Sequence, residues 1–357
     1  MTQATAIGRQ SALEPGGPSA ERIGELWNLM LGAGIVVTVL VLIGLAWAIW
    51  RPRAPGLVGE ADRPVDARGE SLNDESGGRG HEESGRPRSE RTGVRVMVWA
   101  GFVAPAIILG ALLVITMRVL ANVSLPSHAL AAHDAPPALG ELTIKVTGRQ
   151  FWWEVEYLDA EPQRTFETAN ELRIPVGRRV IVRLAADDVI HSFWVPGLAG
   201  KMDLVPGRTN MTFIEASRPG VWRGQCAEYC GVQHAKMAFT VVAETPGAFE
   251  AWAARQRSAA SQPADSSSAA DRNTFLASGC ALCHTVRGTS ARGEMGPDLT
   301  HIASRLTLAA GTLPNVRGHM YGWVANPQAI KPGSKMPAVP LSPAELHAIV
   351  RYLGTLR

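Results

Sequence analysis

The stretch CAEYCGVQHAKM, residues 226–237, gathers two thiols, an imidazole and a thioether within twelve positions. Thiolate and thioether sulfurs are soft ligands, which favour copper over hard cations. The spacing lets both cysteine sulfurs converge from one loop, and a second imidazole must come from elsewhere in the fold. His191 is the best candidate, because it lies at the end of a predicted strand in DDVIHSFWVP, residues 187–196. The candidate copper ligands are therefore Cys226, Cys230, His234, Met237 and His191.

Two other interpretations of this loop stay open at the level of sequence. A structural zinc site could use two thiolates and two imidazoles, although zinc has no need of Met237. A disulfide between Cys226 and Cys230 is possible in an oxidising compartment.

A second motif, Cys280-Ala-Leu-Cys283-His284, is the attachment signature of a covalently bound c-type haem. The two thiols add to the haem vinyl groups, and His284 is the expected proximal ligand of the iron. The distal ligand is expected from Met336, in the segment KPGSKMP at residues 331–337. Met320 and His319 are alternatives, and Met295 lies too close to the attachment site. A thioredoxin-like redox pair is a further alternative, but it requires a βαβ setting and no adjacent histidine.

The composition limits the remaining possibilities. The chain has 357 residues, enough for two or three domains, and its net charge of +3 gives no indication of a nucleic-acid partner. The motifs above use all 4 cysteines, so the chain does not resemble a disulfide scaffold.

Residues 26–50 and 96–117 carry no charged side chain and are each long enough to cross a bilayer. Basic residues border the connecting loop 51–95 more densely than the N-terminal tail 1–25. The loop is therefore expected to be cytoplasmic and disordered, with both termini on the outer face. These features predict a multi-pass protein of a bacterial-type inner (cell) membrane, with the rest of the chain on the periplasmic side.

Beyond the second hydrophobic run, the pattern changes to short alternating strands separated by Gly-Pro turns. Examples are ELTIKVTG at 141–148 and MAFTVVAE at 237–244. This predicts an all-β sandwich over residues 140–246. A short helix and a Ser/Ala-rich flexible linker follow at 247–270, and then an all-α domain at 271–357. Its final helix is announced by the capping box Ser342-Pro343-Ala-Glu345.

Residues 141–245 resemble subunit II of haem–copper oxygen reductases, the family with a dinuclear CuA centre. The resemblance is carried by the segments DVIHS (188–192), KMD (201–203), PGR (206–208), SRPG (217–220) and GQCAEYCGVQH (224–234), and by the two preceding hydrophobic helices. It implies a cupredoxin-like fold.

The resemblance also implies a role for each copper-loop residue. Cys226 and Cys230 would bridge two copper ions, and His191 and His234 would each bind one of them. Met237 would be a weak axial ligand of the copper bound by His191, and the backbone carbonyl of Glu228 would bind the other copper. In this family the Glu228 carboxylate also reaches a magnesium ion at the boundary with subunit I.

One segment departs from the family pattern. The family often has Gly-His-Gln-Trp-aromatic-Trp before this domain, and the first Trp receives electrons from external cytochrome c. Here the segment is GRQFWW, residues 148–153, with Phe151 at that position. Trp152 and Trp153 are candidates for electron transfer, and packing against the copper loop is the alternative role.

From about residue 271, the chain resembles class I cytochromes c. The segment GPDL at 296–299 matches a turn in which the Pro297 carbonyl accepts the N–H of the proximal imidazole. The two resemblances together imply the fused subunit II of a caa-type cytochrome c oxidase.

That family passes electrons from haem c to CuA and on to subunit I, where oxygen is reduced to water. The complex is a proton-translocating oxidoreductase, and no catalytic residue is expected in this chain. Expected partners are subunits I and III, the membrane, and a periplasmic donor such as a cytochrome c or a cytochrome bc complex. Alternatives are the CuA subunit of a nitric oxide reductase and, in a different class, a membrane-anchored copper-binding or copper-delivery protein.

Overall fold

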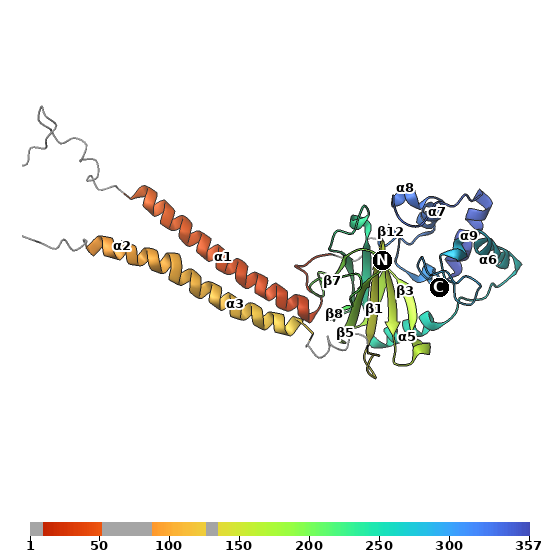
Figure 1. Ribbon diagram of the computed structural model, residues 1–357, viewed down its shortest axis with the longest axis horizontal. Helices are drawn as coiled ribbons and strands as arrows, with labels where there is room; N and C mark the ends of the chain where they lie inside the picture. The colour runs from red at the N-terminus through yellow and green to blue at the C-terminus, as the bar shows by residue number, and fades with distance from the viewer. Residues whose placement is uncertain (1–9, 52–87, 126–134) are drawn as a thin grey trace, which may run out of the picture. The chain divides into compact units, whose positions relative to one another are not determined.

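The computed structural model describes residues 10–51, 88–125 and 135–357 (Figure 1). The chain divides into two compact units. One contains Leu26–Met117, and the other joins Met1–Glu25 to Arg118–Arg357. Most of the predicted cytoplasmic loop 51–95 lies outside the described residues.

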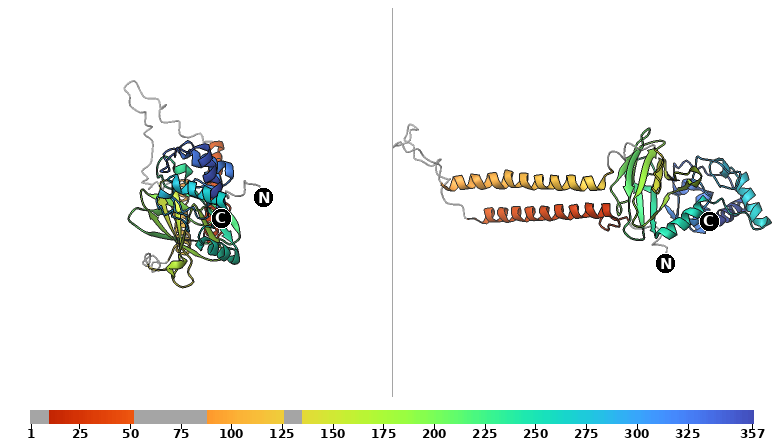
Figure 2. Two further views of the ribbon diagram at one scale, coloured as in Figure 1. Left: turned by 90° about the vertical axis from the view of Figure 1, so that its right-hand side faces the viewer. Right: turned by 90° about the horizontal axis from the view of Figure 1, so that it is seen from below.

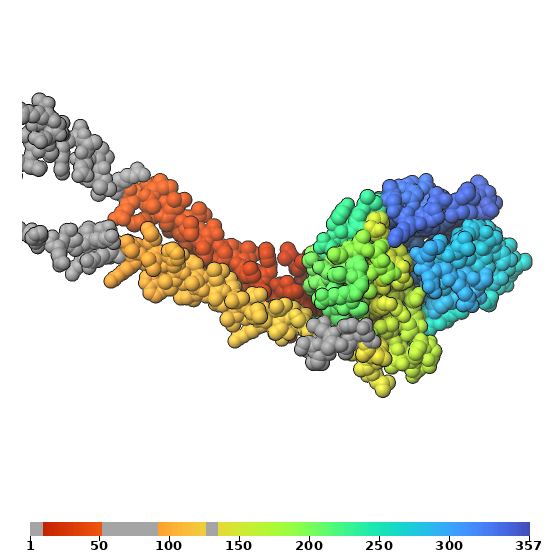
Figure 3. Space-filling model, in the orientation of Figure 1, coloured from red at the N-terminus to blue at the C-terminus, as the bar shows by residue number. Residues whose placement is uncertain are grey.

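The first unit is built from helices. These are α1 (Pro18–Trp50), α2 (Arg88–Val98), the π-helical turn η2 (Trp99–Val103) and α3 (Ala104–Val123). Within the described residues, two helical spans, Pro18–Trp50 and Thr92–Val123, are long and apolar enough to cross a membrane. Their large apolar side chains are exposed. The space-filling view shows the atoms of these helices on one face (Figure 3). Both predicted hydrophobic runs, 26–50 and 96–117, fall within these spans.

The wide turn η2 stands directly before Pro105. Proline has no N–H and its ring clashes with the carbonyl four residues earlier, so a regular α-helical ladder cannot continue through it. The Ala104 N–H bonds instead to the Trp99 carbonyl, five residues back. The helix therefore passes the proline through a π-turn, a common way to accommodate such a break.

The sandwich predicted at 140–246 is present as two five-stranded sheets (Figure 2). One sheet has the order β3-β2-β1-β5-β8 and the other has the order β4-β10-β9-β6-β7. Strands β1 and β5 pair in parallel, as do β10 and β4. The bounds are β1 Thr143–Arg149, β2 Trp152–Leu158, β3 Phe166–Ala169, β4 Glu171–Pro175, β5 Val180–Ala186, β6 His191–Trp194, β7 Met202–Leu204, β8 Asn210–Ile214, β9 Gly220–Cys226 and β10 Ala238–Glu244.

The core of the sandwich follows from alternation along the strands. In β2, every second side chain is buried, and Trp153 is fully enclosed. Phe193 and Phe239 stack with ring centroids 4.7 Å apart, and Trp153 lies edge-on to both. Aromatic packing of this kind fixes the ends of β6, β9 and β10, where the copper-loop residues begin.

Part of the predicted N-terminal tail packs on the sandwich. The Gly16 N–H bonds to the Gly197 carbonyl at 2.7 Å, and the Ser217 N–H bonds to the Gly16 carbonyl at 2.8 Å. Ser19 and Ala20, at the start of α1, are buried.

The C-terminal region is helical, as expected. Its elements are α5 Pro246–Arg257, α6 Ser266–Ala277, η5 Cys280–Leu282, η6 Ile302–Ser304, β11 Thr307–Leu308, β12 Leu313–Pro314, α7 Arg317–Ala325, α8 Pro327–Ile330 and α9 Pro343–Thr355. The capping box at Ser342 and Glu345 is formed, which confirms the predicted start of the last helix. Helix α6 begins at Ser266 behind a second capping box at Asp265, inside the stretch assigned to the linker.

Candidate copper centre and haem site

Three neighbouring strands position the copper-loop residues. β6 begins at His191, β9 ends at Cys226, and Phe193 of β6 pairs with Cys226. The chain then passes through Cys230 and the short helix η4 (His234–Lys236) and reaches Met237, directly before β10. One remote histidine and one loop therefore meet at the same end of the sheet.

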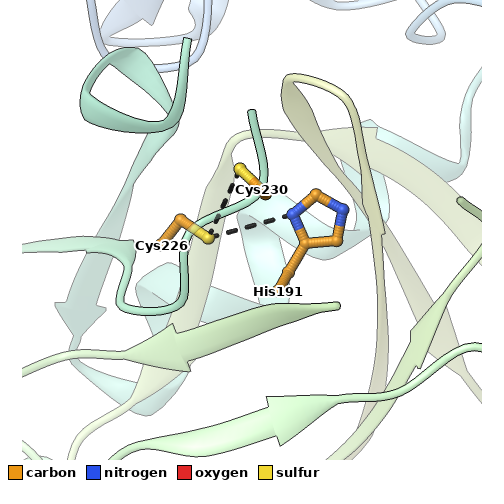
Figure 4. Close-up of side chains that lie close together, drawn as sticks. All are labelled: His191, Cys226 and Cys230. Carbon is orange, nitrogen blue, oxygen red and sulfur yellow. Dashed lines mark hydrogen bonds between the residues drawn. The ribbon is translucent and has the colours of Figure 1, made fainter. Parts of the chain in front are cut away.

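The donor atoms of these residues lie at ligand spacing, and Figure 4 shows those of His191, Cys226 and Cys230. The two sulfurs, Sγ of Cys226 and of Cys230, are 3.8 Å apart. Cys226 Sγ lies 3.8 Å from Nδ1 of His191 and 3.1 Å from the Glu228 carbonyl oxygen. Cys230 Sγ lies 3.7 Å from both Nδ1 of His234 and Sδ of Met237. All six predicted copper-binding positions are thus brought together.

These distances fit residues that share bound metal. Two sulfurs held at about 2.3 Å from one tetrahedral ion lie about 3.8 Å apart, and a sulfur and an imidazole nitrogen lie about 3.6 Å apart. A disulfide requires about 2.05 Å. All four cysteines are free, so the disulfide alternative is wrong for this structure. The adjacent thioether, which zinc does not need, favours copper.

The protonation of the two thiols is strongly coupled. A hydrogen bond from Cys230 is the main cause that lowers the pKa of Cys226, to about 3. The Cys226 thiolate in turn raises the pKa of Cys230 far above its ordinary value. The pair therefore holds one thiolate without metal, and a cation that bridges both sulfurs must displace the second proton.

His191 is held by groups on both sides of its ring. Burial lowers its pKa, but hydrogen bonds to Cys226 and Asp188 outweigh burial and raise the pKa. Its Nε2 lies 2.9 Å from the Asp188 carboxylate, which leaves Nδ1 facing Cys226. A carboxylate behind a ligating histidine fixes the tautomer and the ring orientation.

The two candidate electron-transfer tryptophans differ in their surroundings. Trp153 is fully buried and lies edge-on to His191, with ring centroids 5.9 Å apart. Trp152 is half-buried and lies beneath the Arg149 guanidinium. Trp153 therefore packs against the proposed ligand His191, whereas Trp152 contacts Arg149.

Glu228 presents its backbone and its side chain in different directions. Its carbonyl oxygen lies 3.1 Å from Sγ of Cys226, while the residue as a whole is exposed. The carboxylate is thus available to a neighbouring surface, the arrangement that the magnesium prediction requires.

The haem-attachment motif forms a tight turn at η5. The His284 N–H bonds to the Cys280 carbonyl at 3.0 Å, and Nδ1 of His284 donates to the Pro297 carbonyl at 2.8 Å. Burial lowers the pKa of His284, so the imidazole is neutral and Nε2 is left as the metal-facing atom. Cys280 and Cys283 are half-buried and free. The donor set therefore fits a covalently held haem.

The three candidates for the distal position lie in different settings. Met336 is half-buried on a loop whose carbonyl accepts from Gln328 at 2.7 Å. Met320 belongs to the buried core of the C-terminal region. Nδ1 of His319 bonds to the Pro314 carbonyl at 2.9 Å. Met336 remains the prediction, because its side chain is not committed to the core.

Sequence reasoning missed several contacts between the C-terminal region and the sandwich. Lys331 is buried, and its ammonium nitrogen donates to the Phe151 carbonyl at 2.6 Å. Lys335 lies 3.0 Å from the Asp188 carboxylate. Their basic charge beside Met336 was visible in the sequence, but no local pattern indicates which acceptors they meet.

Comparison with known proteins gives independent results for the two regions. Residues 156–244 match the family of cytochrome c oxidase subunit II, periplasmic domain, and residues 270–357 match cytochrome c. The chain is 39% identical over 230 residues to cytochrome c oxidase subunit 2 of Alkalihalophilus pseudofirmus, covering 64% of this chain and 65% of that protein. It is 31% identical over 227 residues to the subunit of the same name from Bacillus subtilis, covering 60% and 62%.

Among solved structures, the periplasmic domain of subunit II of cytochrome oxidase from Bradyrhizobium japonicum is 32% identical. The match covers 32% of this chain and 93% of that one, with a TM-score of 0.31. Residues 156–244 are therefore similar to the periplasmic domain of cytochrome c oxidase subunit II, and residues 270–357 are similar to cytochrome c.

Proposed function

We propose that this chain is the electron-transfer subunit of a terminal respiratory oxidase of the caa type. When bound, haem c and a dinuclear copper centre supply one-electron transfer, from haem c to copper and on to subunit I, where oxygen is reduced to water. The observation that carries the proposal is the meeting of six potential copper-ligand atoms in one cluster, on the same polypeptide as a complete haem-attachment motif.

Each residue has a distinct task. Cys226 and Cys230 would supply the thiolates that hold the copper ions, and His191, His234, Met237 and the Glu228 carbonyl would be the other copper-binding groups. In the second region, Cys280 and Cys283 would attach the haem, His284 and Met336 would bind its iron, and the Pro297 carbonyl orients His284. The exposed Glu228 carboxylate is the proposed contribution to a magnesium site shared with subunit I.

The surroundings of Phe151 support the fused haem as the immediate donor. Phe151 occupies the position of the family's electron-entry tryptophan, and its side chain is 5% exposed. Lys331 of the haem domain bonds to its carbonyl. An external cytochrome has little access to a buried ring, whereas the fused domain already contacts this segment.

Two helices long and apolar enough to span a membrane support a membrane anchor. We place the chain as a multi-pass protein in a bacterial-type inner membrane, with both redox domains on the periplasmic face. Subunits I and III are the proposed partners within the complex. A periplasmic cytochrome c or a cytochrome bc complex is the proposed donor to haem c.

Flash-induced electron transfer from haem c to copper tests this function. A fused donor is present at an effective concentration of about millimolar, so the rate should not depend on protein concentration. A rate that rises with protein concentration would contradict the fused-donor pathway. Oxygen uptake rather than nitric oxide consumption by the purified complex separates the oxidase from a nitric oxide reductase. Retention of copper against a chelator separates it from a copper-delivery protein.

A further inference from the structure

Three residues of the haem domain, Lys331, Lys335 and Ala310, contact the sandwich close to the proposed copper ligands. Lys335 bonds to the Asp188 carboxylate, and Lys331 bonds to the Phe151 carbonyl. The Ala310 carbonyl accepts from the N–H of Ala238 at 3.0 Å. Each acceptor or donor on the sandwich adjoins a proposed copper ligand. Asp188 bonds to His191, Phe151 follows Gln150, which bonds to Cys230, and Ala238 follows Met237.

Lys335 and His191 are connected through the carboxylate of Asp188. Asp188 lies 2.9 Å from Nε2 of His191 and 3.0 Å from Nζ of Lys335, through different oxygens. His191 is fully buried, and the Asp188 side chain is 17% exposed. A carboxylate that accepts from a ligating imidazole makes that ligand more basic, and a cation on its other oxygen weakens this effect.

The contacts at Phe151 and Ala238 adjoin the copper loop itself. The Gln150 side chain donates to the Cys230 carbonyl at 2.6 Å, and the carbonyl of the next residue, Phe151, is the acceptor for Lys331. Ala238 directly follows Met237, whose carbonyl accepts from the Cys226 N–H. The haem domain therefore contacts the backbone directly after the ligand loop, at Ala238, and the segment that bonds to Cys230, at Phe151.

The docking loop on the haem domain is itself unusual. Ala309, Ala310 and Gly311 all have positive φ, at 52°, 56° and 73°. Successive non-glycine residues in the left-handed region cost free energy, so their surroundings must hold them there. Their three carbonyls accept from Lys331, the Ala238 N–H and Arg223, two of which belong to the sandwich.

We infer that the haem domain is part of the support of the copper centre as well as its electron donor, with Lys335 as a positioning residue that acts through Asp188 on His191. The inference rests on the proposed function. The contacts between the two domains would then influence the copper centre permanently. A separate cytochrome could do so only while it is docked.

The test uses the full-length chain loaded with haem and copper, comparing Lys335→Gln with Lys145→Gln. Lys145 is a matched control, since it is an exposed lysine paired with Glu156 at 3.5 Å on the other sheet. Loss of the Lys335 cation stabilises the oxidised copper centre. The equilibrium constant for electron sharing should therefore shift about threefold toward haem c, while the control stays unchanged.

A double-mutant cycle shows whether the effect passes through Asp188. Asp188→Asn alone should shift the same equilibrium toward copper, and Lys335→Gln should have little further effect in that background. Lys335→Arg should restore the wild-type copper resonance spectrum. Equal copper potentials and spectra in Lys335→Gln and the wild type would overturn the inference. If the wild type does not bind two coupled coppers, the proposed function itself is overturned, and with it the inference that rests on it.

Discussion

At the scale of single residues, the proposed copper site depends on close packing around its ligand residues. Gly148 lies on β1 against the ring of His191, and a Cβ built there would fall 2.7 Å from its Cδ2. Trp153 closes another side of the same ring. His191 therefore has no room to rotate, which keeps Nδ1 directed at Cys226.

Replacing Gly148 by alanine should displace His191. We expect a loss of about 1–3 kcal/mol in the free energy of unfolding, because overpacking a filled core is costly, together with weaker copper retention. Gly200→Ala is the control, since a Cβ there meets nothing within 4 Å. Urea denaturation and copper content of the purified chain measure both effects. Identical behaviour of the two variants would show that His191 can relax.

The distal haem ligand gives a second prediction at this scale. A Met/His iron has a higher potential than a His/His iron, so Met336→His should lower the haem c midpoint potential by on the order of 0.1 V. Met295→Leu, at a residue that is 68% exposed, should leave it unchanged. A redox titration monitored by haem absorbance decides. If Met320→Leu changes the potential while Met336→His does not, Met336 is not the ligand.

At the scale of elements, strands and helices were predicted correctly where the sequence pattern within a single segment was sufficient. The alternating runs at 141–148 and 237–244 became β1 and β10, and the capping box at Ser342 opens α9 as expected. The ligand loop was recognisable because its donors are contiguous. His191 is 35 residues from Cys226, and it was assigned from its sequence context and the family resemblance.

Contacts between segments that fold separately were not predictable in the same way. Lys331 and Phe151 are 180 positions apart, and no periodicity in either segment encodes their meeting. The packing of Gly16 between Gly197 and Ser217 has the same origin. Both depend on the shapes of complete domains, which a local pattern does not contain.

Helices α6 and α9 of the haem domain are joined by a two-pronged ion pair. Asp271 accepts from Nε and Nη2 of Arg351 at 2.8 and 2.6 Å. The hydrogen bond from Arg351 is the main cause that lowers the pKa of Asp271. A carboxyl with a lowered folded-state pKa stabilises the fold above its unfolded value of about 3.9, and this stabilisation is lost as the pH falls through the folded value.

Asp271→Asn should therefore destabilise the haem domain at neutral pH, and its difference from the wild type should shrink below about pH 4. Glu294→Gln, at an exposed position of the same domain, serves as the control. Thermal unfolding monitored by haem absorbance at several pH values provides the comparison. A difference that stays constant down to acid pH would exclude the ion pair as its source.

At the scale of the whole chain, a buried lysine joins the two redox domains. Lys331 is 2% exposed, and burial lowers its pKa to about 7. Its unfolded pKa is about 10.4, so between these values the unfolded chain holds a proton that the folded chain lacks. Stability linked to Lys331 therefore increases as the pH rises from 7 toward 10.

Lys331→Met should remove this pH dependence. The wild type should gain stability relative to the variant across that interval, by at most about 1.4 kcal/mol per pH unit. Urea denaturation of the full-length chain at pH 7, 8.5 and 10 measures the difference. Lys145→Met, at the exposed lysine on β1, should keep the wild-type slope. Parallel pH profiles for the wild type and Lys331→Met would mean that Lys331 is charged at the interface.

The central claim is that one chain carries a haem and a dinuclear copper centre in contacting domains. The most direct measurement is the metal content and the paramagnetic resonance spectrum of the full-length chain, produced with haem-maturation machinery and copper. We predict two coppers and one haem iron per chain, with one unpaired electron coupled equally to both copper nuclei. A single copper, or zinc in its place, would contradict the claim for the Cys226–Met237 loop, even with the haem present.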